Sequence, residues 1–499
     1  MAVGSSAKFL VLSKCVDSPG FRALFCKHIF SCGYHHSSKS LNQQASLPNV
    51  VKRSYTSDPV VSHSRLTPQE VTDILREKEF SLDLETEGSV LGYDSNQLAS
   101  NNPIEDFRAE AKCVLTTGML FGVFDGHGGA LCAQVLSKRL FEYISASLLP
   151  PDLLLKYLRS PGENQLLKTF NDSIDFVQDL KLLYAQHFKE YLDELSVSQN
   201  RDFQMKDALE KAFLSLDADL SREAQLMDDE NVNMKTLSVG LSGAVSCVAH
   251  IDGPHLHVAS VGDCQAILGV RNDDNIWTAK KLSIDHNSDN AQEVQRVLSE
   301  HPQTEHNSVI RRERLLGQLA PLRAFGDFRY KWDKKVLEDL VVPILGDQAV
   351  PHGYFTPPYL TARPDITHHV LTPRDKFLVI ATDGLWDEIS PLQVVRLVGE
   401  HMSGKVILNP LQLPRKSMTL NEINDLLLQR QEGLKMKPID SNAATHLIRN
   451  ALGGSEYGIE HSKIAHILSL PQEVVRLFRD DITVTVVYFN TDYLRHTHH

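Results

Sequence analysis

Residues 122–130, GVFDGHGGA, place Asp125, His127 and three closely spaced glycines where an apolar strand meets a helix. A phosphate-binding loop requires Gly-Lys-Ser/Thr, and a dinucleotide-binding turn requires a third glycine where this chain has Leu131. Neither pattern fits. An aspartate at the C-terminal end of a strand, beside glycines that let the backbone approach closely, suits a hard cation. Because Asp-Gly is also a common turn pair, this stretch alone leaves a purely structural turn as the alternative.

The segments around this turn predict a strand followed by a long helix. Residues 113–124 are apolar, and residues 130–149 repeat apolar side chains at helical spacing until Pro150 and Pro151 end the pattern. Residues 152–232 are predicted to be mostly amphipathic helix, with apolar residues three and four apart.

Further along the chain the period changes to that of strands. Short apolar runs at residues 237–251, 256–262, 265–270 and 278–284 are separated by turn residues, which predicts an antiparallel meander. A helix is expected at 291–300, followed by buried strands that end at Asp383 and begin after Asp481. Because strands and helices are segregated rather than alternating, the sequence predicts an α+β fold with antiparallel sheets and helices on their faces.

Composition narrows the class of protein. The 499 residues are 42% hydrophobic and 23% charged, which is typical of a globular chain long enough to bury a large core. The net charge of −12, without a basic stripe, argues against nucleic acid as a partner. No apolar run reaches the roughly 20 residues of a membrane span. The cysteines form no Cys-x-x-Cys pair, and Cys113, Cys132, Cys247 and Cys264 are predicted to be small core residues.

The first 57 residues differ from the rest. They hold seven basic residues, one acidic residue and many serines, which is the composition of an organellar transit peptide. Residues 53–57 resemble a mitochondrial processing site, with cleavage expected near Tyr55. A disordered basic tail is the alternative. We expect residues 58–490 to form the functional domain and residues 491–499 a C-terminal tail.

Acidic residues lie where several predicted strands meet their loops. Asp125 and Asp383 follow buried strands, and Asp481 precedes one. If these strand ends converge, their carboxylates repel one another unless cations neutralise them. Oxygen ligands favour Mg²⁺ or Mn²⁺ over Zn²⁺. A site with two such ions can activate water and clamp a phosphoester, while His127 protonates the leaving group as general acid. Each aspartate taken singly is more often a cap or turn residue than a metal ligand.

Seven motifs together carry a family resemblance. They are IED (104–106), VFDGHGG (123–129), SGAVSCV (242–248), VGDCQAIL (261–268), RAFGDF (323–328), ATDGLWD (381–387) and RDDITVTVV (479–487). In this order they resemble the PP2C-type family of metal-dependent serine/threonine phosphatases. The resemblance implies two stacked antiparallel sheets flanked by helices, with helical insertions near 152–232, 333–360 and 403–440.

The resemblance also implies a metal-binding set. In the family pattern, Asp125 bridges two Mg²⁺ or Mn²⁺ ions, and the carbonyl of Gly126 ligates one of them. Asp383 and Asp481 complete the protein ligands of the other ion, and Glu105 acts through water.

Four further residues take family roles by the same match. Asp106 supports the edge that carries Glu105, and His127 is the general acid. Asp263 and Asp387 match acids that hold a third, weaker metal.

Two positions depart from the broad family pattern. The arginine that grips the substrate phosphate is replaced by Asn101, whose amide donates hydrogen bonds without a charge-assisted bidentate grip. The usual arginine after the VGD turn is Gln265, which we interpret as the loss of a structural ion pair.

Additional segments resemble the pyruvate dehydrogenase phosphatase branch of the family. These are SNQL (95–98), PIED (103–106), TPPYLT (356–361) and NAATHLIR (442–449), and Asn101 is also expected of this branch. Details such as VGDC resemble the second catalytic isoform more than the first. The resemblance implies a mitochondrial matrix enzyme that dephosphorylates the pyruvate dehydrogenase E1α subunit, docks on the E2 lipoyl domain and has a regulatory subunit as a further partner. The alternatives are a phosphatase of another mitochondrial phosphoprotein and a catalytically inactive binding protein.

Overall fold

A seven-stranded antiparallel sheet carries the opening sequence stretch. The computed structural model describes residues 66–84, 88–159, 165–170, 180–197, 203–228, 231–413 and 417–496. The predicted leader and its processing site therefore lie outside the described residues. The strand order is β15-β9-β8-β4-β3-β5, with β14 paired to β8. The strands are β3 (Phe107–Cys113), β4 (Met119–His127), β5 (Leu167–Phe170), β8 (Gly243–Asp252), β9 (His255–Val261), β14 (Phe325–Gly326) and β15 (Asp365–Val370).

A six-stranded antiparallel sheet stacks against the first, in the order β1-β2-β17-β16-β10-β11. Its strands are β1 (Phe80–Asp83), β2 (Val90–Leu98), β10 (Gln265–Arg271), β11 (Trp277–Lys281), β16 (Asp375–Ala381) and β17 (Ile482–Phe489). The predicted α+β class with two stacked antiparallel sheets is confirmed.

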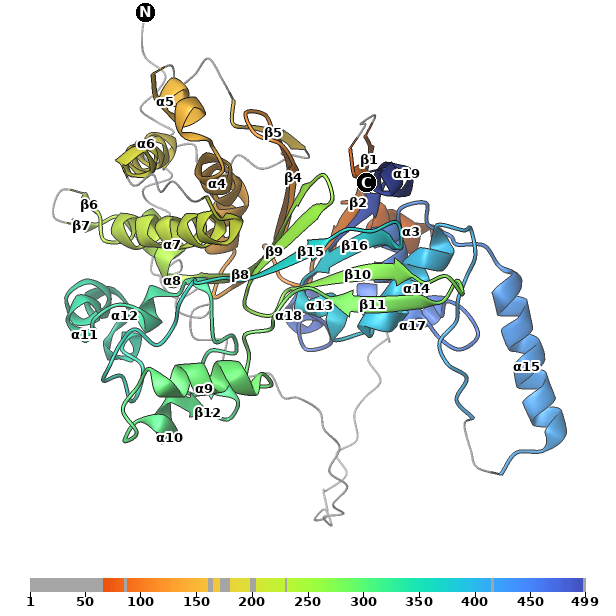
Figure 1. The fold of residues 1–499 in the computed structure, drawn as a ribbon. Helices are drawn as coiled ribbons and strands as arrows, with labels where there is room; N and C mark the ends of the chain where they lie inside the picture. The colour runs from red at the N-terminus through yellow and green to blue at the C-terminus, as the bar shows by residue number, and fades with distance from the viewer. Residues whose placement is uncertain are drawn as a thin grey trace, which may run out of the picture.

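Helices cover the outer face of each sheet (Figure 1). On the seven-stranded sheet they are α4 (Leu131–Ser147), α5 (Pro151–Arg159), α6 (Lys181–Val197), α7 (Met205–Glu223) and α8 (Met234–Leu241). On the six-stranded sheet they are α3 (Pro68–Arg76), α13 (Asp383–Trp386), α14 (Pro391–His401), α16 (Ala443–Gly453) and α17 (His461–Leu468). Cys113, Cys132, Cys247 and Cys264 are buried and free, as predicted.

The remaining elements lie mostly outside these layers. They are β6 (Met227–Asp228), β7 (Asn231–Val232), α9 (Ala291–Ser299), α10 (His306–Val309), β12 (Ile310–Arg311), β13 (Arg314–Leu315), η2 (Phe328–Tyr330), α11 (Lys334–Val336), η3 (Leu337–Val341), α12 (Val342–Leu345), η4 (Asp347–Ala349), α15 (Leu420–Lys435), α18 (Gln472–Val475) and α19 (Thr491–His496). Helix α15 projects away from the sheets (Figure 1). None of the described helices is long and apolar enough to span a membrane.

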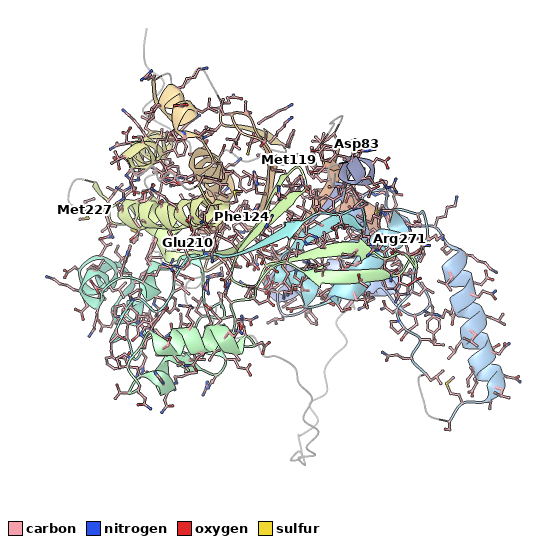
Figure 2. All side chains as sticks on the ribbon, in the orientation of Figure 1. Asp83, Met119, Phe124, Glu210, Met227 and Arg271 are labelled. Atoms are coloured by element: carbon pink, nitrogen blue, oxygen red, sulfur yellow. The ribbon has the colours of Figure 1, made fainter. Side chains whose placement is uncertain are left out.

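The alternation of β4 fixes which side chains face which layer. The ring of Phe124, which is labelled in Figure 2, lies 6.3 Å from that of Phe141 in α4, and this contact shows that the side chain faces the helices. The ring of Phe121 lies 5.3 Å from that of Tyr93 in β2, so this side chain faces the other sheet. Because successive strand residues point to opposite faces, Asp125 shares the face of Phe121 and lies between the two sheets.

Two local predictions were wrong. Residues 234–241 form α8 rather than the start of a strand, because the Asn233 side chain accepts hydrogen bonds from the Lys235 and Thr236 N–H groups and caps a helix there. The predicted meander is also interrupted, since β9 lies in one sheet and β10 in the other. The chain crosses between them at Gly262, whose φ of +92° is a conformation open mainly to glycine. This crossing places Asp263 between the sheets.

Candidate active site

The turn after β4 is tied to the loop that carries Glu105. The Gly126 N–H donates a 3.1 Å hydrogen bond to the Glu105 carbonyl. A Cβ at Gly126 would lie only 2.5 Å from that oxygen, so a side chain here would separate the two segments. Gly128 and Gly129 follow with φ of +66° and +124°, which lets the backbone reverse into α4. The glycines of the opening stretch therefore hold Asp125 and Glu105 at one edge.

Asp125 and Asp383 meet at that edge, one from each sheet. Burial raises the pKa of Asp125 well above its usual range, and the negative charge of Asp383 adds to the effect. Burial likewise raises the pKa of Asp383, with the charges of Asp263 and Asp480 contributing. The Asp125 and Asp383 carboxyls lie close enough for each to affect the pKa of the other. Both carboxylates can ionise together only when a cation compensates their charge.

Asp481 occupies a different place from the predicted one. Its Oδ1 accepts hydrogen bonds from the backbone N–H groups of Ser100 and Asn101, the latter at 2.8 Å. Its Oδ2 accepts from the Glu105 N–H at 2.8 Å and from Asn101 Nδ2 at 3.0 Å. Four N–H donors therefore occupy this carboxylate, and it holds the 100–105 loop in place.

The neighbouring Asp480 is the acid whose charge acts on the Asp125 and Asp383 pair. Asp480 Oδ1 accepts a hydrogen bond from the Asp481 N–H at 2.8 Å. The carboxylate of Asp481, which was predicted to bind metal, thus accepts its hydrogen bonds from the 100–105 loop, whereas the charge of Asp480 acts on the pair.

Glu105 and Asp106 are buried just before β3. Burial raises the pKa of Glu105 to about 7, although the charge of Arg476 opposes the shift. Burial also raises the pKa of Asp106, with the charge of Asp481 adding to it. Asp106 Oδ2 accepts a 2.8 Å hydrogen bond from the Thr382 hydroxyl, next to Asp383. Asp106 thus joins the start of β3 to the end of β16.

His127 is paired with an aspartate that the sequence did not single out. Its Nε2 lies 2.6 Å from Asp327 Oδ2, and the two side chains are only 13% and 7% exposed. Burial on its own lowers the pKa of His127, but the Asp327 charge and hydrogen bond outweigh it, so the net shift is upward. A Cβ at Gly243 would lie 2.2 Å from His127 Nε2 and 2.3 Å from Asp327 Oδ2, so a glycine is required there. The pair favours the protonated imidazole, which is the form that a general acid needs.

Asp263 and Asp387 flank the same edge at its periphery. Burial raises the pKa of Asp263 to about 6, with the charges of Asp285 and Asp387 adding to the shift. Asp387 ends α13, is exposed, and donates its backbone N–H to the Asp383 carbonyl at 2.9 Å. Both acids therefore lie near Asp383, while Asp387 faces solvent.

The donor set suits Mg²⁺ or Mn²⁺. The described residues contain no group of three or more His, Cys, Asp or Glu side chains already arranged to hold a metal ion. Mg²⁺ is usually bound by one or two carboxylates and keeps several waters, so such a closed protein cage is not required. The neighbouring Asp125 and Asp383 carboxyls mark the place where a divalent cation would compensate negative charge. Without a bound cation, the carboxylates at this edge raise one another's pKa.

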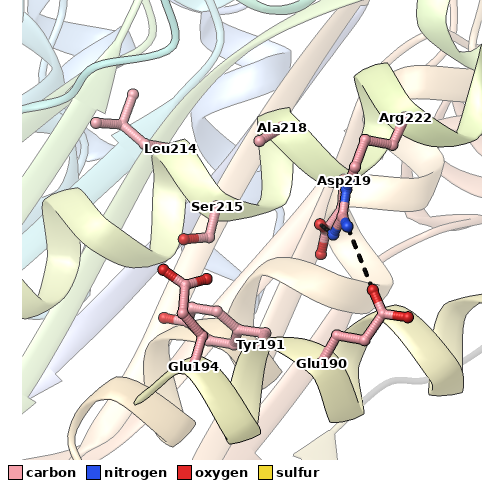
Figure 3. Close-up of a pocket in the computed structure, with 8 residues that line it drawn as sticks. All are labelled: Glu190, Tyr191, Glu194, Leu214, Ser215, Ala218, Asp219 and Arg222. Atoms are coloured by element: carbon pink, nitrogen blue, oxygen red, sulfur yellow. Dashed lines mark hydrogen bonds and ion pairs between the residues drawn. The ribbon is translucent and has the colours of Figure 1, made fainter. Parts of the chain in front are cut away.

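A separate groove of about 360 Å³ lies between α6 and α7 (Figure 3). Its lining is Glu190, Tyr191, Glu194, Leu214, Ser215, Ala218, Asp219 and Arg222. Arg222 Nη1 lies 3.2 Å from Glu190 Oε2 across it. None of the predicted site residues lines this groove, so it is distinct from the carboxylate edge.

Two residues of the edge escaped sequence reasoning, Asp327 and Asp480. Asp327 lies in RAFGDF after Gly326, with a φ of +50°, in a Gly-Asp pair like that of VGDC. The Gly-Asp pair, which occurs in both motifs, is the sequence signal that could have identified Asp327. Asp480 is adjacent to Asp481, and only the three-dimensional arrangement separates their roles.

Comparisons with known proteins identify the family of the chain. The profile of the family described as Protein phosphatase 2C matches residues 176–422. The chain is 44% identical over 463 residues to the Bos taurus pyruvate dehydrogenase (acetyl-transferring) phosphatase 1, mitochondrial, covering 88% of this chain and 85% of that protein. It is 42% identical to the Homo sapiens phosphatase 2, mitochondrial, of the same description, covering 86% of this chain and 84% of that protein. These two identities do not separate the isoforms.

More distant relatives are similar over most of the chain. The Saccharomyces cerevisiae pyruvate dehydrogenase (acetyl-transferring) phosphatase 1, mitochondrial, is 31% identical, covering 80% of this chain and 69% of that protein. A crystal structure of a serine-threonine phosphatase 2C from Toxoplasma gondii aligns at 17% identity and a TM-score of 0.42, over 83% of this chain and 99% of that chain. On the strength of its sequence relatives, the chain belongs to the protein phosphatase 2C family of metal-dependent protein serine/threonine phosphatases.

Proposed function

We propose that this phosphatase removes phosphate from phosphoserine on the E1α subunit of pyruvate dehydrogenase in the mitochondrial matrix. The observation that carries the proposal is the 44% identity to a mitochondrial pyruvate dehydrogenase phosphatase over 88% of the chain. The carboxylate edge with its adjacent His127–Asp327 pair supplies the chemistry that such a reaction needs.

The proposed metal-binding residues are Asp125, Asp383, Asp480 and the Gly126 carbonyl, with Glu105 acting through water. Two Mg²⁺ or Mn²⁺ ions bound there would lower the pKa of a water molecule and neutralise charge on the phosphoryl oxygens. Asp263 and Asp387 are the candidates for a third, weaker ion. Asp481 takes a positioning role, because its carboxylate organises the 100–105 loop.

His127 gives its proton to the serine oxygen as the phosphoester bond breaks. The Asp327 carboxylate favours the charged imidazole before the step and fixes the orientation of the ring. The 100–105 loop positions the Asn101 side-chain amide beside Asp480 and Asp481, and the amide donates hydrogen bonds to both carboxylates. To donate to a substrate oxygen, the amide would have to break one of these hydrogen bonds. The amide therefore contributes little to phosphate binding.

The domain boundaries and partners form part of the same proposal. Residues 58–490 make one phosphatase domain with insertions near 152–232, 333–360 and 403–440, preceded by a leader. The predicted tail begins with helix α19, whose Leu494 is buried against the domain. Docking on the E2 lipoyl domain and association with a regulatory subunit follow from the family branch.

The test is phosphate release from phosphorylated E1 by the purified protein. Release is expected only with Mg²⁺ or Mn²⁺, and Asp125→Asn is expected to abolish it. Equal activity on several matrix phosphoproteins would favour the alternative substrate. An intact Asp125 and Asp383 pair that binds metal without turnover would favour a binding protein.

A further inference from the structure

A phosphomonoester dianion needs cationic or N–H donors at this edge beyond any bound metal, because the surrounding side chains are acidic. The Asn101 amide is already engaged by Asp480 and Asp481. Positive charge beside the site beyond that of His127 would therefore come from another segment.

The segment that follows α18 lies directly beside the 99–105 loop. Gln472 Nε2 donates to the Ser100 carbonyl at 2.8 Å, and the Ser100 hydroxyl donates to the Arg479 carbonyl at 2.8 Å. Val475 is buried, which fixes α18 on the body of the protein. These contacts hold residues 476–479 next to Glu105.

Two arginines of this segment have different surroundings. The Arg479 guanidinium donates to the backbone carbonyls of Ala99 and Asp480, which commits it to holding the loop. The Arg476 Nη1 lies 3.5 Å from Glu105 Oε2, and the Arg476 side chain remains 30% exposed. Arg476 thus combines proximity to the carboxylate edge with access from solvent.

Apolar side chains extend this surface. Leu477 and Phe478 are 72% and 60% exposed, although they lie within three residues of Asp480. Their position beside Arg476 places an apolar surface next to a guanidinium at the rim of the site. A phosphoserine flanked by protein chain presents the matching combination of charge and apolar contact.

We propose that residues 476–478 form the substrate-recognition segment, in which Arg476 binds the phosphate of the phosphoserine and Leu477 and Phe478 contact the flanking chain. The inference rests on the proposed phosphatase function. Arg476 supplies the positive charge that Asn101 lacks, and it does so from the C-terminal part of the chain. Its guanidinium can bridge Glu105 and a phosphate oxygen, since its planar donors serve two acceptors.

The first test measures phosphate binding by Arg476→Ala, Arg476→Lys and the wild-type protein. Inorganic phosphate serves as a competitive inhibitor of p-nitrophenyl phosphate hydrolysis at saturating Mn²⁺. Loss of charge-assisted hydrogen bonds predicts an increase of about 10- to 100-fold in the inhibition constant for phosphate and in KM, with a smaller change in kcat. Arg476→Lys should recover part of the affinity, because it keeps the charge but loses the planar fork. Arg374→Ala, which removes an exposed arginine paired with Asp273, is the matched control.

The same variants separate phosphate binding from a role confined to Glu105. If Arg476 only neutralised Glu105, Arg476→Ala would change the Mn²⁺ concentration at half-maximal activity and leave the inhibition constant for phosphate unchanged. That result would overturn the proposal. A wild-type protein without metal-dependent hydrolysis would instead refute the proposed function itself.

The apolar part is tested with Leu477→Ser combined with Phe478→Ser. KM for the phosphorylated pyruvate dehydrogenase complex should rise about 10-fold, while KM for p-nitrophenyl phosphate should not change, because the small substrate has no flanking chain. Equal KM values on the phosphoprotein for variant and wild type would remove Leu477 and Phe478 from the recognition segment. Unfolding temperatures measured alongside establish that each variant is folded.

Discussion

Replacement of Asp327 by asparagine isolates the contribution of the carboxylate that faces His127. The two side chains are 2.6 Å apart and little exposed, so the interaction is a desolvated, charge-assisted hydrogen bond. Such a bond stabilises the imidazolium by about 1.5–3 kcal/mol, which corresponds to about 1–2 pKa units. Burial alone lowers the pKa of His127. Asp327→Asn should therefore lower it by about that amount.

The consequence for catalysis depends on pH in a defined direction. The protonated imidazole is the active form of a general acid, and it is lost as pH rises through the folded-state pKa. In Asp327→Asn this decline in kcat should begin about 1–2 pH units lower than in the wild type, with a loss of about 10- to 100-fold on the alkaline side. The loss should shrink toward lower pH.

The assay is the pH profile of kcat with p-nitrophenyl phosphate at saturating Mn²⁺. Asp327→Glu keeps the charge and should retain part of the alkaline activity. Gly243→Ala reaches the same pair by a steric route, since its Cβ would collide with both side chains. A profile for Asp327→Asn that falls equally at every pH would refute the assignment of Asp327 as the group that keeps His127 protonated.

Three further predictions concern metal binding, pH and stability. Asp480→Asn should raise the Mn²⁺ concentration for half-maximal activity at least about tenfold, whereas Asp481→Asn should mainly lower the free energy of unfolding by about 1–3 kcal/mol, because it disturbs buried hydrogen bonds. Titration calorimetry measures Mn²⁺ binding, and denaturant unfolding measures stability. If Asp481 were the ligand, Asp481→Asn would weaken Mn²⁺ binding more than Asp480→Asn does. In metal-free protein, the Glu105 pKa of about 7 lies above its unfolded value, so the protonated form favours folding and its contribution is lost as pH rises from about 4.5 through 7. Relative to Glu105→Gln, the wild type should lose about 3 kcal/mol of stability over this range. Parallel pH dependences of stability for the two proteins would contradict this prediction. Glu223→Gln should lower the free energy of unfolding by about 3–5 kcal/mol, because Glu223 accepts hydrogen bonds from Arg139 at 2.8 and 2.9 Å in a buried pair. Urea unfolding at pH 7 measures this loss. A loss below about 1 kcal/mol would contradict the prediction and show that the surrounding hydrogen bonds rearrange around the change.

The local sequence around β4 and β16 was sufficient to predict where the carboxylates gather. An apolar run followed by Asp-Gly predicts a buried strand that ends in a turn, and two such runs lead to Asp125 and Asp383. Their meeting across two sheets required the family pattern, because no local rule specifies which strand ends are neighbours. The structure brings the two carboxyls together at one edge, where the charge of Asp383 acts on Asp125.

The residues that escaped prediction depend on backbone geometry beyond the reach of local patterns. Asp480 and Asp481 precede β17 as adjacent acids, and the direction in which each carboxylate points follows from the 100–105 loop, over 370 residues away in the chain. Asp327 reaches His127 from a left-handed conformation after the two-residue strand β14. The break in the meander at Gly262 likewise depends on the packing of two sheets rather than on turn composition.

The most direct test of the account is phosphate release from phosphorylated pyruvate dehydrogenase complex, followed as Mg²⁺ or Mn²⁺ is added to metal-free protein. We predict no release without metal, saturable release with either ion, and loss of release in Asp125→Asn and Asp383→Asn. Release that persists in a chelator, or in both variants at saturating metal, would contradict the central claim that this carboxylate edge carries a metal-dependent phosphatase reaction.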